Sequence, residues 1–253
     1  MPSRGETIRD QACAVNTSPI AQSKNDSQPV FGAKRWALNG DAFYGANDTH
    51  DRIPAGLYRC AMNPNVGPVL LKQTVKTDNL LELPDDAVAS VLDEFNLFWT
   101  VEHKFRERGF VFKRGYLLWG PPGSGKTSGL QLMIKRLIDD HDGVVLFIDA
   151  PQDAAYCLQL LRSIEANRPV ICVMEDIDAL VHRYGENEYL ALLDGEAQVD
   201  RICFLATTNY PERLDKRFVD RPSRFDTIKY VGMPTGAARK MYLENREPTL
   251  SKS

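Results

Sequence analysis

The stretch GPPGSGKT, residues 120–127, decides the fold of this chain. It matches the pattern GxxxxGK[ST], in which glycines let several backbone N–H groups converge on phosphate oxygens. The apolar run YLLW precedes it at 116–119, and a helical pattern of apolar residues follows it from Leu130 to Leu137. A strand, a glycine-rich loop and a helix in this order form a phosphate-binding unit, so we favour this interpretation over a chance turn beside a surface lysine.

The residue types of the loop predict separate roles. Lys126 is expected to contact the β- and γ-phosphates of a nucleotide, and the hydroxyl of Thr127 is expected to ligate Mg²⁺. The helix that follows adds the positive end of its dipole to the same site. The predicted nucleotide-binding residues are Gly120, Pro121, Pro122, Gly123, Ser124, Gly125, Lys126, Thr127 and Ser128.

A second motif follows the apolar run VICVM at 170–174, where Glu175 and Asp176 come next. In an open parallel sheet, ligands bind at the carboxyl ends of the strands. One carboxylate must hold Mg²⁺ with its waters, and another must orient or deprotonate the attacking water. An acidic pair after a strand is often only a solvated turn, but beside a phosphate loop we interpret this pair as catalytic.

The apolar runs of the central part predict the fold class. They are short, continuous and rich in β-branched or aromatic residues, and they lie at 116–119, 144–148, 170–174 and 202–206. The segments between them are long enough for helices, which predicts a doubly wound α/β fold with a parallel sheet. Before them, a helix is expected to begin at Asp85 or Asp86 and to end near Gly109, with an apolar stripe on one side.

The composition changes along the chain and predicts four parts. Residues 1–29 are polar and are expected to form a disordered tail. Residues 30–84 contain several aromatic side chains and two strand-like runs, at 56–62 and 68–76, and we expect them to form a small β-containing module. Residues 85–235 form the predicted core, and residues 236–253 complete the chain.

Whole-chain properties narrow the function classes. The chain of 253 residues is 43% hydrophobic and 26% charged with a formal net charge of −3, which is typical of a globular protein and does not favour nucleic acid as a partner. It has no apolar run long enough to span a membrane and no signal-peptide core, so we expect a cytoplasmic protein. The five cysteines form no CxxC pair and are interpreted as structural.

Together these motifs resemble the AAA+ ATPases over residues 85–235. The order Glu175-Asp176, where the family usually has Asp-Glu, is similar to the mitochondrial branch that translocates the folded Rieske protein during respiratory-complex assembly. The lead-in RGYLLWG at 114–120 and LLDG at 192–195 share this similarity. The resemblance implies a P-loop NTPase core, ATP and Mg²⁺ as cofactors, ATP hydrolysis, and a homo-oligomeric ring of six or seven subunits.

The resemblance also implies roles for single residues. Glu175 joins Thr127 as a metal ligand, and Asp176 takes the water-activating position with a side chain one methylene shorter than usual, which predicts slow turnover. Asn209, after the strand FLATT, resembles the residue that holds the attacking water. RPSRFD at 221–226 resembles the segment whose arginines, here Arg221 and Arg224, reach the neighbouring subunit's ATP.

The chain departs from the family pattern at three places. Ser223 replaces a glycine, and one extra residue separates Asn209 from the arginines, so either Arg221 or Arg224 could reach the phosphate, or both could lie in a surface salt-bridge loop. Only residues 236–253 correspond to the helical lid of the family, as a remnant of it, which predicts little or no lid. Either this sequence is a truncated form of a longer chain, or the natural protein dispenses with lid closure. The segment DAPQD at 149–153 lacks the aromatic side chain of a threading pore loop, and Tyr156 is expected to pack with Leu160.

Three functional hypotheses follow. The favoured one is an ATP-hydrolysing ring that remodels or moves a protein partner, whose identity is not predicted, with the N-terminal module supplying contacts. A nucleic-acid-linked ATPase, such as a replication or packaging accessory, would need a basic face. A non-catalytic assembly protein would bind ATP as a structural ligand because Asp176 is too short to catalyse.

Overall fold

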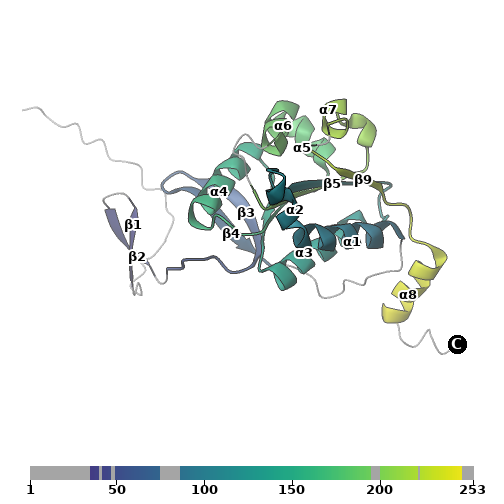
Figure 1. Cartoon of the computed structure of the whole chain (residues 1–253), viewed down its shortest axis with the longest axis horizontal. Helices are drawn as coiled ribbons and strands as arrows, with labels where there is room; N and C mark the ends of the chain where they lie inside the picture. Colours follow the sequence, from purple (N-terminus) through teal and green to yellow (C-terminus); the bar gives the residue numbers. More distant parts are fainter. Residues whose placement is uncertain are drawn as a thin grey trace, which may run out of the picture. The chain divides into compact units, whose positions relative to one another are not determined.

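The computed structural model describes residues 35–39, 42–46, 49–74, 86–194, 200–221 and 223–246 (Figure 1). The chain divides into two compact units, Met1–His50 and Asp51–Ser253. In the first unit, β1 (Arg35–Asn39) and β2 (Ala42–Ala46) form an antiparallel hairpin. The tail predicted at 1–29 lies outside the described residues.

The second unit is built on a seven-stranded sheet with the strand order β4-β3-β6-β7-β8-β5-β9. Only β4 runs antiparallel to its neighbour, β3, and every other neighbouring pair is parallel. The predicted doubly wound α/β fold is therefore confirmed. The strands are β3 (Gly56–Asn63), β4 (Gly67–Gln73), β5 (Lys113–Trp119), β6 (Val144–Phe147), β7 (Val170–Met174), β8 (Ile202–Thr208) and β9 (Thr227–Tyr230).

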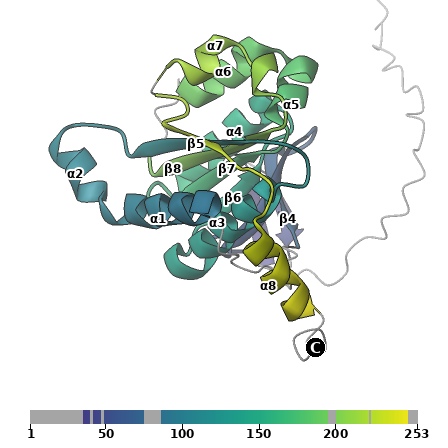
Figure 2. The ribbon, with the colours of Figure 1, turned by 90° about the vertical axis from the view of Figure 1, so that its right-hand side faces the viewer.

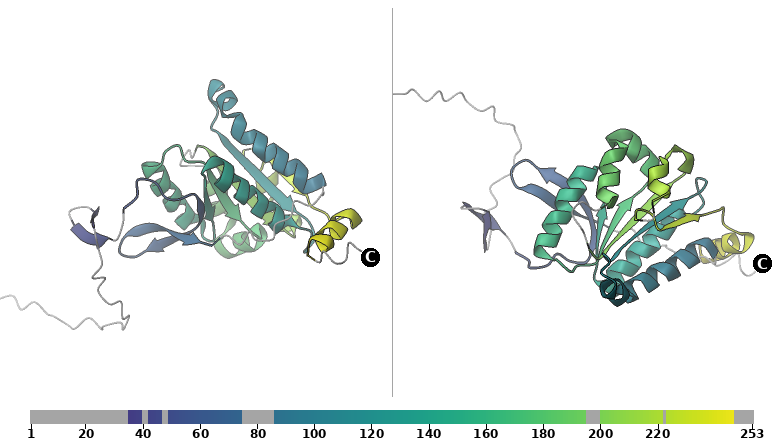
Figure 3. Two further views of the ribbon diagram at one scale, coloured as in Figure 1. Left: turned by 90° about the horizontal axis from the view of Figure 1, so that it is seen from below. Right: turned by 45° about the horizontal axis from the view of Figure 1, so that its top comes forward.

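Helices cover both faces of this sheet (Figure 2). On one face lie α1 (Asp86–Thr100) and α3 (Lys126–His141), side by side (Figure 3). The other face carries α4 (Pro151–Ile164), α5 (Ile177–Tyr184), α6 (Glu186–Asp194) and α7 (Lys216–Val219). The remaining helices are α2 (Glu102–Glu107), η1 (Pro211–Arg213) and α8 (Gly236–Arg246). Across the described ranges, no helix has the length and apolar character needed to cross a bilayer.

The helix predicted to run to Gly109 is two helices in the structure, because the chain breaks at Val101 between α1 and α2. The apolar stripe itself is confirmed, since five side chains of α1 are at most 9% exposed. Phe98 stacks on Phe112 with ring centroids 4.1 Å apart. Burial of this kind contributes about 1.5–3 kcal/mol per large side chain. The five are Val91, Leu92, Phe95, Phe98 and Trp99.

The boundary of the core lies elsewhere than predicted. We expected residues 30–84 to form a separate module, but β3 pairs in parallel with β6, so that Gly56 lies opposite Val144 in the ladder. Tyr58 and Cys60 of β3 are buried in the same hydrophobic cluster as α4. Only β1 and β2 belong to the first compact unit, and β3 and β4 extend the core sheet.

The sheet order brings the functional motifs together. β8 lies between β5 and β7, so the carboxyl ends of these three strands are neighbours. β5 also lies very close to the segment after Ser223, because a Cβ atom at Gly115 would stand 1.8 Å from the carbonyl oxygen of Arg224. A glycine is therefore required at this point of β5.

All four cysteines in the described part of the chain are buried, with free thiols, which is the placement expected of structural residues. They are Cys60, Cys157, Cys172 and Cys203. Cys13 lies outside the described residues.

Candidate nucleotide-binding site

A cavity of about 400 Å³ lies at the carboxyl ends of β5, β7 and β8. Its walls come from three separate parts of the sequence: the phosphate loop, the acidic turn after β7 and the end of β8. The structure therefore brings together most of the predicted site residues. The lining residues are Pro122, Gly123, Ser124, Gly125, Lys126, Thr127, Ser128, Glu175, Asp176, Thr207 and Asn209.

The phosphate loop depends on left-handed backbone at two glycines. Gly123 has φ +77° and Gly125 has φ +96°, which residues with a Cβ atom rarely adopt. Directly after Gly125, α3 begins at Lys126, and the first N–H groups of a helix have no partner inside the helix. The loop and the helix start thus present N–H groups and a positive dipole end to an anion.

Lys126 is held inside this loop. Its side chain is buried, and its Nζ donates to the carbonyl oxygens of Gly120 and Pro121, both at 2.9 Å. Burial lowers the pKa of Lys126, whereas the carboxylate of Asp176 raises it. A triphosphate would offer this ammonium charged oxygens in place of neutral carbonyls, and charge-assisted hydrogen bonds are the stronger ones.

The acidic turn places two carboxylates on the cavity. Glu175 is half-buried, and its pKa is raised by burial and then by neighbouring Asp176. Asn209 donates from Nδ2 to Oδ1 of Asp176 at 3.3 Å, so the two residues predicted to handle the attacking water are in contact. Mg²⁺ prefers oxygen ligands, and Glu175 and Thr127, which both line the cavity, supply a carboxylate and a hydroxyl that could hold it.

The threonines at the end of β8 were not among the predicted site residues. Thr207 lines the cavity, and its Oγ1 accepts a hydrogen bond from the backbone N–H of Asp176 at 3.1 Å. The hydroxyl of Thr208 donates to Oδ1 of Asp178 at 2.7 Å. The sequence does contain a signal for these two residues, because their hydroxyl groups stand at the carboxyl end of an otherwise apolar strand.

The two predicted arginines do not line the cavity of their own chain. Arg224 is 5% exposed, and its Nε and Nη2 each donate to a carboxylate oxygen of Asp194 at 2.8 Å. Arg221 meets the same carboxylate through Nη1 at 3.1 Å, but its side chain is 60% exposed. Arg224 is therefore fixed within its own chain, and Arg221 is presented to solvent.

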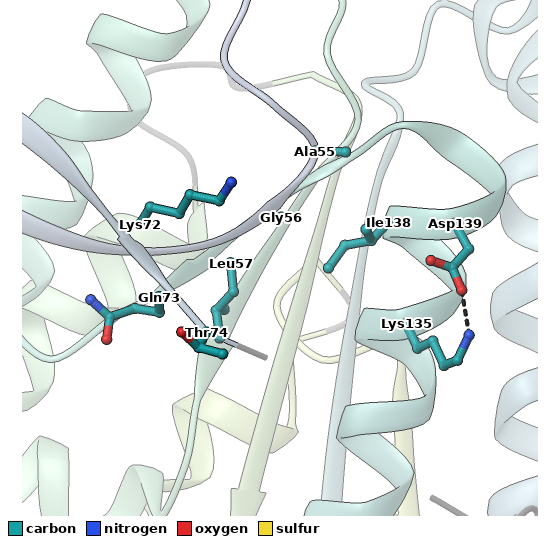
Figure 4. A pocket seen from close by; sticks show the side chains of 9 residues that line it. All are labelled: Ala55, Gly56, Leu57, Lys72, Gln73, Thr74, Lys135, Ile138 and Asp139. Atoms are coloured by element: carbon teal, nitrogen blue, oxygen red, sulfur yellow. Dashed lines mark hydrogen bonds and ion pairs between the residues drawn. The ribbon is translucent and has the colours of Figure 1, made fainter. Parts of the chain in front are cut away.

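A second hollow, of about 500 Å³, lies at the amino end of the parallel strands (Figure 4). Lys72 and Gln73 line it from β4 and Thr74 from directly after that strand, while Lys135 is already paired with Asp139 along α3. Its lining holds neither a pair of acids nor a nucleophile with a base. Of these two hollows, the cavity at the phosphate loop is therefore the stronger candidate for a functional site.

Comparison with protein families agrees with this assignment. Residues 116–233 match the model of the ATPase family associated with various cellular activities (AAA). The predicted resemblance to the AAA+ ATPases is therefore confirmed.

Similar curated proteins include a mitochondrial chaperone. The chain is 33% identical over 159 residues to the probable mitochondrial chaperone bcs1 of Schizosaccharomyces pombe, covering 57% of this chain and 34% of the relative. It is 29% identical over 178 residues to the ATP-dependent zinc metalloprotease FTSH 12, chloroplastic, of Arabidopsis thaliana, covering 60% of this chain and 17% of that protein. The human ATPase family gene 2 protein homolog A is 30% identical over 165 residues, covering 56% of this chain and 18% of that protein. The chain spans about a third or less of the length of these relatives.

The pairing of Asp194 with the arginines predicts a dependence of stability on pH. The hydrogen bond from Arg224 holds the pKa of Asp194 below its ordinary value of 3.8. Its carboxylate therefore stabilises the fold at neutral pH, and this contribution is lost as the pH falls through the lowered pKa. We expect Asp194→Asn to reduce the free energy of unfolding by about 2 kcal/mol at neutral pH, with the difference from wild type shrinking below pH 3.8.

Urea unfolding of both proteins from neutral pH down to about pH 3 measures this difference, across the range where Asp194 titrates. Asp220→Asn, at an exposed position after α7, serves as the matched control and should change little. A destabilisation by Asp194→Asn that is as large at the acidic end as at neutral pH would contradict a charge-dependent pair.

Proposed function

We propose that this chain binds Mg-ATP in the cavity at the phosphate loop and hydrolyses it as a subunit of a homo-oligomeric ring. The observation that carries the proposal is the convergence of the loop, the acidic pair and Asn209 on one cavity from three separate strands. Phosphoryl transfer requires positioning and charge stabilisation more than covalent chemistry, and these residue types supply both.

Each residue takes a distinct part in the proposed reaction. Lys126 leaves its two loop carbonyls to contact the β- and γ-phosphates, and the loop N–H groups hold the remaining oxygens. Thr127 and Glu175 would hold Mg²⁺, which would supply positive charge next to the phosphates. Asp176 accepts a proton from the attacking water, and Asn209 orients that water.

Two substitutions separate binding from hydrolysis. We expect Lys126→Ala to weaken ATP binding about a hundredfold, because the phosphates lose a charge-assisted contact. Asp176→Asn should bind ATP as wild type does and lose at least about a hundredfold in turnover, because the amide keeps the shape without a basic oxygen. Binding is measured with a fluorescent ATP analogue and turnover by phosphate release.

These variants also test the alternative of a non-catalytic ATP-binding protein. Phosphate release by wild type that Lys126→Ala does not reduce would refute the site. Wild-type binding of ATP without any phosphate release would favour the structural-ligand alternative. Normal turnover in Asp176→Asn, with loss in Glu175→Gln, would show that the two carboxylates have exchanged roles.

The arginines support a ring in which one subunit completes the site of the next. Arg221 is exposed and does not line its own cavity, so its guanidinium is available to a neighbouring subunit's ATP. Arginine is suited to this role because its planar fork stabilises charge on a transferring phosphoryl group. Arg224 then serves as the anchor that fixes the segment through Asp194.

This division predicts different defects for the two arginines. Arg221→Ala should keep the stability of wild type and lose at least about tenfold in turnover. Arg224→Ala should lower the free energy of unfolding by about 3 kcal/mol, because it leaves Asp194 without its buried partner. Mixing Lys126→Ala with Arg221→Ala chains should restore some turnover, because mixed interfaces carry both intact halves. No recovery in mixtures of confirmed assemblies would argue against action between subunits.

We also propose that the ring acts on a folded or surface-docked protein partner and does not thread it. The segment 149–153 is tied down in the structure: Arg59 donates to the carboxylate of Asp149 at 2.6 Å, and the hydroxyl of Tyr189 donates to its carbonyl oxygen at 2.6 Å. Residues 151–153 form the first turn of α4. The expectation that Tyr156 packs is wrong, since this side chain is 53% exposed, and it must be included in the test.

Threading is tested with a stable fluorescent protein that carries an unstructured tag. We expect the wild-type ring to consume ATP without loss of fluorescence, because 149–153 offers no aromatic grip. Progressive loss of fluorescence that disappears in Tyr156→Ala would refute the proposal and identify Tyr156 as the gripping residue. Phosphate release in the same sample shows that the ring is active.

Contacts with the partner are proposed to come from the first compact unit. Deletion of the whole predicted module at 30–84 is unsuitable for testing this, because it removes β3 and β4 from the core sheet. Deletion of 1–50 leaves the sheet complete and is the appropriate variant.

A further inference from the structure

Asp176 has an unfavourable backbone conformation. It joins β7 to α5 with φ +48° and ψ +53°, in the left-handed region, which costs energy for residues with a Cβ atom although aspartate enters it more often than most. Such a conformation persists only where the surrounding structure holds it. The contacts of Asp176 are therefore expected to decide where its carboxylate points.

The backbone of Asp176 is held at both of its polar groups. Its carbonyl oxygen accepts from the N–H groups of Ala179 and Leu180 at 2.9 and 3.2 Å, and Thr207 holds its N–H. The Oγ1 of Thr207 accepts from the N–H of Asp176 at 3.1 Å, while Asn209 contacts only the side chain, at 3.3 Å. Thr207 is 2% exposed and belongs to β8, whose ladder with β7 is in register up to Met174 and Ala206. Because β-branched residues are stiff at χ1, this hydroxyl has a fixed position beside the acidic turn.

The contact between Thr207 and Asp176 affects catalysis because the side chain of Asp176 is short. Aspartate has one torsion fewer than glutamate, so it has less freedom to correct for a shift of its own backbone. A displacement of about 1 Å of a catalytic group can cost about a hundredfold in rate. The position of the Asp176 carboxylate thus depends on what fixes residue 176 in the left-handed conformation.

We propose that Thr207 is a positioning residue for ATP hydrolysis, which acts by holding the backbone of Asp176 so that its short carboxylate reaches the attacking water. The inference rests on the proposed function. Thr207 also lines the cavity, but its role is exerted through Asp176.

The test replaces Thr207 by residues that differ in the hydroxyl. Thr207→Val keeps the volume and the β-branch but removes the acceptor, and we expect kcat to fall about tenfold, which corresponds to one net hydrogen bond. The KM for ATP should stay within about threefold, and Thr207→Ser, which keeps the hydroxyl, should retain most of kcat. Thr100→Val removes an exposed hydroxyl that donates to Leu97 O in α1, and should leave kcat unchanged.

A double-mutant cycle separates positioning from a general loosening of β8. In the Asp176→Glu background the longer side chain can adjust its own reach, so Thr207→Val should lower kcat there by less than about threefold. A merely structural role would lower kcat equally in both backgrounds. Thermal unfolding and binding of an ATP analogue are measured for every variant.

The outcomes distinguish failure of this inference from failure of the proposed function on which it rests. If wild type shows no phosphate release that depends on Lys126, the proposed function fails and the inference falls with it. If wild type hydrolyses ATP while Thr207→Val keeps full kcat, only the inference is overturned. Equal losses in both backgrounds, or loss of analogue binding by Thr207→Val, overturn it too, because the defect is then structural.

Discussion

Parallel pairing of β8 between β5 and β7 is the constraint on which the rest of this site depends. Parallel strands end at the same edge of a sheet, so the pairing places a cation-bearing loop, an acidic turn and a polar strand end around one cavity. Burial of all three strands excludes water from beneath the site. The charged side chains that line the cavity are therefore carried by well-packed strands. This arrangement suits a reaction that depends on positioning and electrostatics.

How far the sequence predicts this structure depends on the range of each signal. The phosphate loop, the strands β3 to β8 and the stripe of α1 follow from local patterns, and the structure has them near the predicted positions, whereas β1, β2 and β9 were not predicted. The membership of β3 in the core sheet could not be predicted, because its partner β6 is distant in the sequence and pairing leaves no local mark. The exposure of Tyr156 and the hydroxyl of Thr207 depend likewise on what packs beside them, whereas periodicity describes only one element at a time.

In the arginine segment, two similar residues contact the same carboxylate but differ in their burial. Asp194 meets both Arg221 and Arg224, yet only Arg224 is buried. The end of α6 that carries Asp194 is itself tied to β5, since Nζ of Lys113 donates to the carbonyl oxygen of Leu193 at 2.6 Å. The segment is thus held, through Asp194 and Leu193, against the same strand that leads into the phosphate loop.

The place of β3 in the sheet has a consequence for how the chain is made. β3 and β4 leave the ribosome before any other strand of this sheet, but their neighbour β6 ends only at Phe147. Until that residue has been synthesised, the hairpin has no strand of the sheet to pair with, and its hydrogen-bonding edge stays open to other chains. β3 is therefore synthesised long before its neighbour β6. If translation stops early, the resulting fragment has a strand edge without a partner.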